Sequence, residues 1–212
     1  MPSRVVRLFE STIPSGNAYK VSLMLAHLGV QVDVVELDIL ANPPETRRPD
    51  FLARNPNGRI PVIELDDGSF LAESNAILCY LADGTPYLPG DALGRARALQ
   101  WMFFEQYSHE PYIAVLKFWT LWGGLHKRRP EEIESWMQRG EAALAVMDRH
   151  LRTAPWFTGE RYGVADICLY AYTHTAGEIG FDMEAVPAVT AWLRRVQDQP
   201  GHVAMKSDPT RR

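Results

Sequence analysis

The chain has 212 residues, a formal net charge of −4, and 46% hydrophobic and 23% charged residues, which is the composition of an ordinary soluble globular protein. The slightly acidic balance argues against nucleic-acid binding, and no apolar run is long enough to span a bilayer. The first residues, MPSRVVRLFES, lack the apolar core of a signal peptide. We therefore expect a cytoplasmic protein with neither a nucleic-acid nor a membrane partner.

The first 82 residues alternate strand and helix patterns. The predicted elements are strands at 5–9, 30–34, 62–65 and 70–72, and helices at 21–28, 50–54 and 74–81. The turn Asp66-Asp67-Gly68-Ser69 joins the last two strands as a hairpin. This order predicts a thioredoxin-like α/β domain, with its first strands parallel through a right-handed crossover and an antiparallel hairpin at the edge.

Strand patterns disappear after residue 82. Residues 83–91, DGTPYLPGD, hold two prolines and two glycines and predict a linker. Helical patterns then occupy residues 92–121, 130–152, 164–177 and 187–199. We expect a thioredoxin-like domain at 1–82, a linker at 83–91 and an all-helical domain at 92–212, of which residues 206–212 form a loose tail.

The two cysteines do not suggest metal or redox chemistry. Cys79 and Cys168 are far apart in the sequence, both lie in helical patterns, and no CxxC spacing occurs. The six histidines are scattered, without the spacing of metal ligands. We expect buried thiols in a reducing compartment and no metal.

The segment RIPVIELDDGSFLAESNAILCYLA, residues 59–82, carries two unusual features. Pro61 stands at the start of a predicted strand, where it removes a backbone donor. Glu73 and Ser74 stand where a strand gives way to a helix, so their polar groups meet the free N–H groups of a helix start. Each feature alone has an ordinary interpretation, as an edge-strand proline and a helix N-cap.

Residues 49–82, PDFLARNPNGRIPVIELDDGSFLAESNAILCYLA, resemble the glutathione-binding half of cytosolic glutathione transferases. The resemblance rests on Asn-Pro-x-Gly-x-Ile-Pro, followed about a dozen residues later by Glu-Ser-x-Ala-Ile. The family pairs a thioredoxin-like domain with an all-helical one, which is the order predicted above. The resemblance therefore covers nearly the whole chain, and implies a homodimeric enzyme that uses glutathione as co-substrate.

The resemblance also implies a glutathione site along this segment. In the family the hairpin proline, here Pro61, is cis, which leaves the backbone of Ile60 free to pair with a short peptide. Ser74 can donate to the γ-glutamyl carboxylate at a helix start, and Glu73 can accept from the γ-glutamyl ammonium. Arg59 either meets the glycyl carboxylate or is a solvated surface arginine.

A transferase must ionise the glutathione thiol near neutral pH. Lowering a pKa of about 8.5 by about two units requires about 2.7 kcal/mol, which a hydroxyl donor and a helix N-terminus can supply. The loop before the first helix offers Ser11, Thr12 and Ser15. Serine-type members place this hydroxyl six residues before a helix valine, which points to Ser15 ahead of Ser11. Asn17 matches an asparagine that some bacterial members use beside the thiol.

The loop contains no cysteine, and no tyrosine lies between Leu8 and Ser15, so the resemblance is to the serine-type, bacterial-like branch. In the family the second substrate lies against the first long helix of the helical domain. Tyr107 and Pro111 are our candidates for that pocket. In GVAD, Gly163 replaces the usual Ser or Thr of a capping box, and we expect Asp166 to be structural.

Three functions follow from the resemblance. The first is attack of the glutathione thiolate on a small hydrophobic electrophile, in a detoxifying transferase. The second is glutathione-dependent disulfide or peroxide reduction, towards which Asn17 leans. The third is a non-enzymatic, partner-binding relative, which the retention of Pro61, Glu73 and Ser74 argues against.

Overall fold

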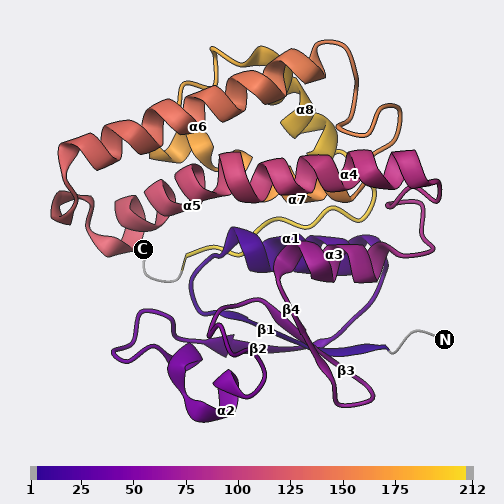
Figure 1. Ribbon diagram of the computed structural model, residues 1–212, viewed down its shortest axis with the longest axis vertical. Helices are drawn as coiled ribbons and strands as arrows, with labels where there is room; N and C mark the ends of the chain where they lie inside the picture. The colour runs from indigo at the N-terminus through magenta and orange to yellow at the C-terminus, as the bar shows by residue number, and fades with distance from the viewer. Residues whose placement is uncertain (1–3, 209–212) are drawn as a thin grey trace. The chain divides into compact units, whose positions relative to one another are not determined.

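The computed structural model describes residues 4–208, and the chain forms two compact units (Figure 1). The first unit comprises residues up to Asp83 together with those from Pro200 onward, and the second comprises Gly84–Gln199. The sequence alone predicted that everything after the linker belongs to the helical domain. The terminal segment groups with the first unit because its backbone lies along that unit's first helix.

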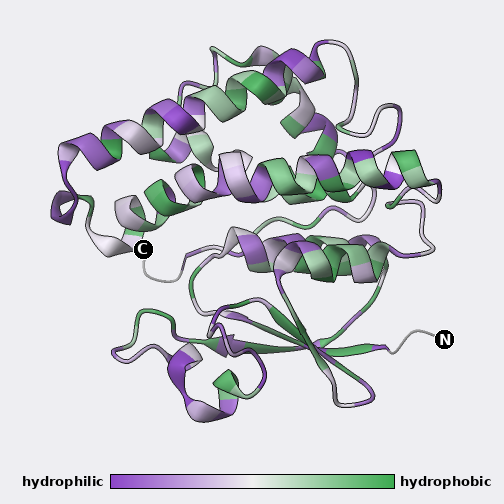
Figure 2. Ribbon diagram, in the orientation of Figure 1, coloured by the Kyte–Doolittle hydropathy of each residue, from purple (hydrophilic) through white to green (hydrophobic). Residues whose placement is uncertain are grey.

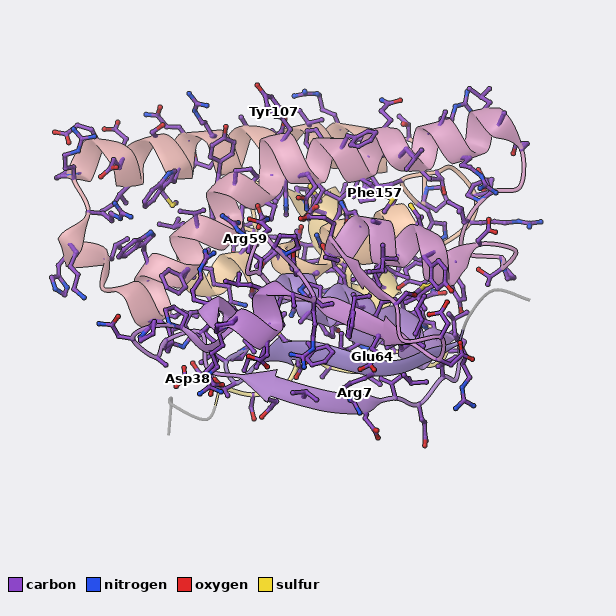
Figure 3. All side chains as sticks on the ribbon, turned by 60° about the horizontal axis from the view of Figure 1, so that its bottom comes forward. Arg7, Asp38, Arg59, Glu64, Tyr107 and Phe157 are labelled. Carbon is purple, nitrogen blue, oxygen red and sulfur yellow. The ribbon has the colours of Figure 1, made fainter. Side chains whose placement is uncertain are left out.

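The first unit contains a four-stranded mixed sheet in the order β2-β1-β3-β4. Its strands are β1 (Val5–Ser11), β2 (Asp33–Leu37), β3 (Val62–Leu65) and β4 (Phe70–Ala72). β1 is parallel to β2 and antiparallel to β3, and β4 completes the hairpin, which confirms the thioredoxin-like prediction. Arg7 and Glu64 form an ion pair of 2.6 Å between β1 and β3 (Figure 3).

Strand β2 begins later than its alternating valines predicted. Its pairing with β1 starts at Asp33, whereas Val30 and Val32 precede the strand and pack against the core. Val30 and Val32 are thus partly buried before the strand begins, whereas Val34 lies within β2 and is 53% exposed.

Helices cover both faces of this sheet (Figure 1). α1 (Gly16–His27) and α3 (Ser74–Ala82) lie on one face, and the short α2 (Pro49–Leu52) lies on the other, after the 3-10 turn η1 (Glu45–Arg47). Successive side chains of β1 point to opposite faces of the sheet, because side chains alternate along a strand. Leu8 joins the core under α1 and α3, and Phe9 packs with Phe51 of α2.

The second unit is entirely helical, as expected. Its helices are α4 (Ala92–Phe104), α5 (Glu110–Phe118), α6 (Pro130–Leu151), α7 (Val164–Thr173) and α8 (Pro187–Gln197), with the short turns η2 (Glu105–His109), η3 (Trp119–Gly123), η4 (Leu125–Lys127) and η5 (Ala176–Ile179). The predicted long helix at 92–121 is thus interrupted by π-helical turns at η2 and η3. Every residue of α7 is buried, whereas α6 alternates hydrophilic and hydrophobic faces (Figure 2). No helix among residues 4–208 combines the length and apolarity needed to cross a membrane.

The predicted role of Asp166 at the start of α7 is confirmed. Its carboxylate accepts a hydrogen bond of 3.1 Å from the N–H of Gly163, and two more from the N–H of Phe157 and the indole of Trp192. A Cβ at Gly163 would lie 2.6 Å from the carbonyl oxygen of Tyr87, which explains why glycine replaces the usual Ser or Thr. Of the two cysteines, Cys168 is buried in α7, but Cys79 in α3 is only partly buried.

Candidate functional site

Ser15 is the N-cap of α1. Its hydroxyl oxygen accepts a hydrogen bond of 3.4 Å from the N–H of Ala18, and its side chain is half-buried. Because the oxygen is the acceptor in this contact, the hydroxyl proton remains able to donate to a ligand. Ser15 therefore combines a hydrogen-bond donor with the positive end of a helix.

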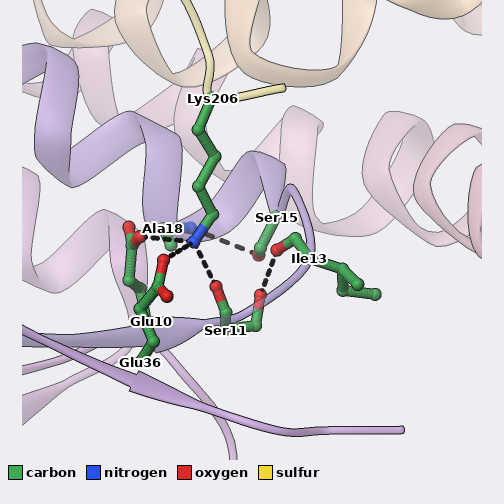
Figure 4. Close-up of polar contacts among 7 residues, drawn as sticks. All are labelled: Glu10, Ser11, Ile13, Ser15, Ala18, Glu36 and Lys206. Carbon is green, nitrogen blue, oxygen red and sulfur yellow. Dashed lines mark hydrogen bonds and ion pairs between the residues drawn. The ribbon is translucent and has the colours of Figure 1, made fainter. Parts of the chain in front are cut away.

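Ser11 has a different environment at the end of β1. The residue is fully buried, and its hydroxyl donates to the carbonyl oxygen of Ile13 within the same loop (Figure 4). A hydroxyl has one proton to donate, and here the loop uses it. The two serines that the sequence left as alternatives therefore differ in burial and in the use of the hydroxyl proton.

Asn17 stands at the centre of a polar network between α1 and α3. Its side-chain oxygen accepts hydrogen bonds from the hydroxyl of Ser74 at 3.1 Å and from the ammonium of Lys20 at 2.8 Å. Lys20 also donates to Ser74 at 3.3 Å and to the side-chain oxygen of Asn75 at 3.4 Å. The network connects the first turn of α1, next to Ser15, with the first turn of α3.

Lys20, whose side chain is fully buried, was not among the residues predicted for the site. The only signal was a lysine in a helix whose neighbouring positions, such as Val21 and Met24, are apolar. Burial of an ammonium requires hydrogen-bond partners, and the polar side chains of Asn17 and Ser74 supply two of them. Lys20 thus belongs to the same cluster as the predicted site residues.

The segment before β3 has the predicted backbone. The Ile60–Pro61 peptide bond is cis, and the pairing of β3 with its neighbours begins at Val62, so Ile60 lies outside the ladder. Arg59 is exposed, and its carbonyl oxygen accepts a hydrogen bond of 2.7 Å from the side chain of Asn55. Its side chain is marked in Figure 3.

Glu73 has an unusual backbone at the start of α3. Its φ is 68°, and among the described residues it is the one residue other than glycine with a positive φ. Its side chain is exposed. It precedes the helix without a side-chain capping bond, while the adjacent Ser74 is only 5% exposed. Non-glycine residues in this region carry backbone strain, which is often found at ligand-binding sites.

The terminal segment reaches the same loop. Lys206 contacts Glu10, Glu36 and the carbonyl oxygen of Ser11 (Figure 4), so residue 206 is held in place, and the expectation of a loose tail is wrong at this position. Residues 209–212 lie outside the described part of the chain. Beside these contacts is a cavity of about 170 Å³, which Ser15, Tyr19 and Lys206 help to line.

Comparison with known proteins identifies the family to which this chain belongs. Residues 14–83 match the glutathione S-transferase N-terminal domain, and residues 130–195 match the C-terminal domain. The crystal structure of a glutathione S-transferase from Pseudomonas fluorescens Pf-5 is 50% identical with a TM-score of 0.91, over 95% of this chain and 98% of that chain. The chain belongs to the glutathione S-transferase family.

Relatives within the glutathione S-transferase family differ in reaction. The disulfide-bond oxidoreductase YfcG of Escherichia coli is 28% identical over 88% of each chain, and the maleylacetoacetate isomerase of Pseudomonas aeruginosa is 30% identical over 87% of this chain and 86% of its own. A glutathione transferase from Burkholderia graminis, 28% identical over 94% of this chain and 86% of its own with a TM-score of 0.81, has two glutathione molecules bound per subunit.

The two residues predicted for the second-substrate pocket have different surroundings in this member of the glutathione S-transferase family. Tyr107, on η2, is 82% exposed and projects from the helical unit in Figure 3, so its ring has no support as a pocket residue. Pro111, on α5, is half-buried. Both assignments stay predictions.

Proposed function

We propose that this protein binds glutathione along Ile60, Glu73 and Ser74 and ionises its thiol beside Ser15. The thiolate then attacks a small hydrophobic electrophile. The observation that carries the proposal is the contact of Asn17 with both Ser74 and Lys20, because it joins the thiol-activating helix start to the γ-glutamyl end of the site. The glutathione bound to the B. graminis relative supports the choice of ligand.

Binding would use groups that the fold presents on adjacent segments. The first turn of α3 offers backbone N–H groups to the γ-glutamyl carboxylate. The hydroxyl of Ser74 donates to Asn17 in this structure, and on binding it would exchange that acceptor for the carboxylate. The exposed carboxylate of Glu73 accepts from the γ-glutamyl ammonium. The backbone of Ile60 pairs with the cysteinyl residue in the manner of an added strand. The exposed Arg59 is the residue before Ile60, and its guanidinium would bind the glycyl carboxylate.

The chemistry would depend on the start of α1. Ser15 donates its hydroxyl proton to the sulfur, and the helix N-terminus adds partial positive charge. The thiol proton is released to water, the sulfur forms a bond to the electrophilic carbon, and the leaving group departs with its electron pair. Ser11 has no comparable role, because its proton is already donated to Ile13.

Disulfide reduction is the second candidate, favoured by Asn17 beside Ser15 and by the relationship to YfcG. The bound thiolate attacks one sulfur of a disulfide, a mixed disulfide forms, and the other sulfur leaves as a thiolate. A second glutathione thiolate then attacks the mixed disulfide, which yields oxidised glutathione and the second product thiol. The two glutathione molecules in the B. graminis relative support such a site. Reduction of a peroxide would end in the same oxidised product.

Calorimetric titration with reduced and then oxidised glutathione tests the proposal. Binding of the reduced form alone supports conjugation, and comparable or tighter binding of the oxidised form supports disulfide reduction. Ser74→Ala should weaken binding of glutathione, whereas Ser135→Ala on α6 should not. A folded protein that binds neither form would overturn both enzymatic proposals in favour of the partner-binding function.

We further propose that the protein acts in the cytoplasm as a homodimer, as the family resemblance implies. Light scattering of the purified protein gives the mass directly. A mass of one 24.0 kDa chain at micromolar concentration would contradict the dimer.

A further inference from the structure

The last described residues form a strap, defined here as residues 200–206, along α1. The side chain of His27 lies 3.0 Å from the carbonyl oxygen of Pro200, and the hydroxyl of Tyr19 donates to the carbonyl oxygen of Val203 at 2.6 Å. In Figure 1 the strap is the yellow segment that follows α1. These contacts lead the chain from the end of α1 back towards its beginning.

Lys206, the last residue of the strap, contacts three acceptors. Its ammonium lies 2.6 Å from a carboxylate oxygen of Glu10 and 2.6 Å from one of Glu36, and it donates to the carbonyl oxygen of Ser11 (Figure 4). Partial burial lowers the pKa of Lys206, but the hydrogen bonds to Glu10 and Glu36 outweigh it, so the pKa is raised. The ammonium is therefore charged at neutral pH.

The two carboxylates need this cation because of the sheet register. Glu10 and Glu36 are directly opposite each other on the parallel strands β1 and β2. Like charges opposite one another on neighbouring strands are destabilising. Lys206 forms an ion pair with each of them and offsets that repulsion.

The same contact fixes the start of the thiol-activating loop. Ser11 is the last residue of β1, and only residues 12–14 separate it from Ser15, the N-cap of α1. The N–H of Thr12 donates to the carbonyl oxygen of Leu37 at 3.0 Å, and Lys206 holds the Ser11 carbonyl oxygen from the other side of the peptide chain. The loop is thus fastened at its β1 end by one lysine from the end of the chain.

We propose that Lys206 is a positioning residue for the thiol-activating loop. It offsets the repulsion between Glu10 and Glu36 and holds the Ser11 carbonyl oxygen, and so keeps Ser15 in place as the N-cap of α1. The structural part of this inference depends on the strap alone. Its catalytic consequence rests on the proposed glutathione function.

Hydrogen exchange in the ligand-free protein tests the structural part. Lys206→Met should raise the exchange rates of the hydrogen-bonded amides of Thr12, Ala18 and Tyr19 by about tenfold, since a partly exposed ion-pair network contributes on the order of 1 kcal/mol. Lys206→Arg should retain most of the protection, and Lys127→Met, which removes a lysine from the helical unit, should leave these amides unchanged. Unchanged exchange in Lys206→Met would overturn the proposal whether or not the protein binds glutathione.

Turnover with glutathione tests the catalytic part. A loop displaced by about 1 Å should lower kcat by about tenfold or more while the glutathione KM stays nearly constant, because the γ-glutamyl site lies on α3. Adding Glu10→Gln and Glu36→Gln to Lys206→Met should recover part of kcat, because the repulsion is then removed. An equal fall of kcat in Lys206→Met and Lys206→Arg, with no recovery in the triple variant, would contradict the electrostatic account.

Discussion

The hydroxyl of Ser74 donates a hydrogen bond of 3.1 Å to the side-chain oxygen of Asn17, and thereby connects the first turns of α3 and α1. The residues are 57 positions apart in the sequence. Each helix start carries partial positive charge, and the buried ammonium of Lys20 adds a full one between them. This arrangement of charge would favour an anionic ligand group, such as the carboxylate of glutathione.

Lys20→Met should weaken glutathione binding by about tenfold, which is the usual size of one charge-assisted contact. The loss should be smaller for a glutathione analogue that lacks the α-carboxylate of the γ-glutamyl residue. Calorimetry with both ligands measures the difference. Equal losses for the two ligands would show that Lys20 supports the fold of the site without acting on the carboxylate.

Ser15→Ala should leave glutathione binding largely intact and raise the pKa of the bound thiol by about one to two units, because the hydroxyl donor to the thiolate is removed. The ultraviolet absorbance of the thiolate, followed against pH in the bound complex, reports this pKa. Ser11→Ala is the matched control, since its hydroxyl donates to Ile13 instead. The assignment fails if Ser11→Ala raises the thiol pKa and Ser15→Ala does not.

Glu73→Gly should change the stability of the fold and the affinity for glutathione in opposite directions. Glycine adopts the φ of 68° without the strain of a Cβ, so the free energy of unfolding should rise by about 1 kcal/mol. The affinity for glutathione should fall, because the carboxylate that we propose to meet the γ-glutamyl ammonium is lost. Glu73→Gln, which keeps the Cβ, should lose affinity without the gain in stability. Denaturant unfolding and calorimetry measure the two effects independently.

Asp166 should make stability depend on pH. Burial raises its pKa from 3.8 to about 7, against the opposing hydrogen bonds from Trp192, Phe157 and Gly163. The folded protein then binds more protons than the unfolded chain between these values. The contribution of Asp166 to the free energy of unfolding is therefore fully present below pH 3.8. It falls as pH rises towards 7, by at most about 1.4 kcal/mol per pH unit.

Asp166→Asn, which cannot ionise, should lose this dependence. The variant should gain stability relative to the original protein as pH increases from about 4 to about 7, as measured by denaturant unfolding at several pH values. A trend in the opposite direction would mean that the three N–H donors stabilise the carboxylate more than burial disfavours it.

The sequence predicted the features that depend on local patterns. The strands β3 and β4, the helix from Ser74 and the Asp166 capping bond to Gly163 were all within reach, because periodicity, turn residues and caps act over a few positions. The boundary of β2 was less accurate, since pairing with β1 decides where it begins.

The roles of Lys20 and Lys206 could not be predicted in this way. Lys20 meets Ser74 across 54 positions, and Lys206 meets Glu10 across 196, so no local pattern records either contact. A lysine in an apolar helix and a lysine near the chain end both have ordinary surface interpretations, and only the tertiary structure distinguishes the buried case from the solvated one.

The position of Lys206 also has a consequence for how the protein is made. The first unit is continuous in space but discontinuous in the chain, because its first segment ends at Asp83 and residues 200–206 return to it after the helical unit. During translation, β1, β2 and α1 leave the ribosome long before Lys206 is synthesised. The Glu10–Glu36 repulsion at the end of the nascent sheet is therefore relieved only after the helical unit and the residues up to Lys206 have been synthesised.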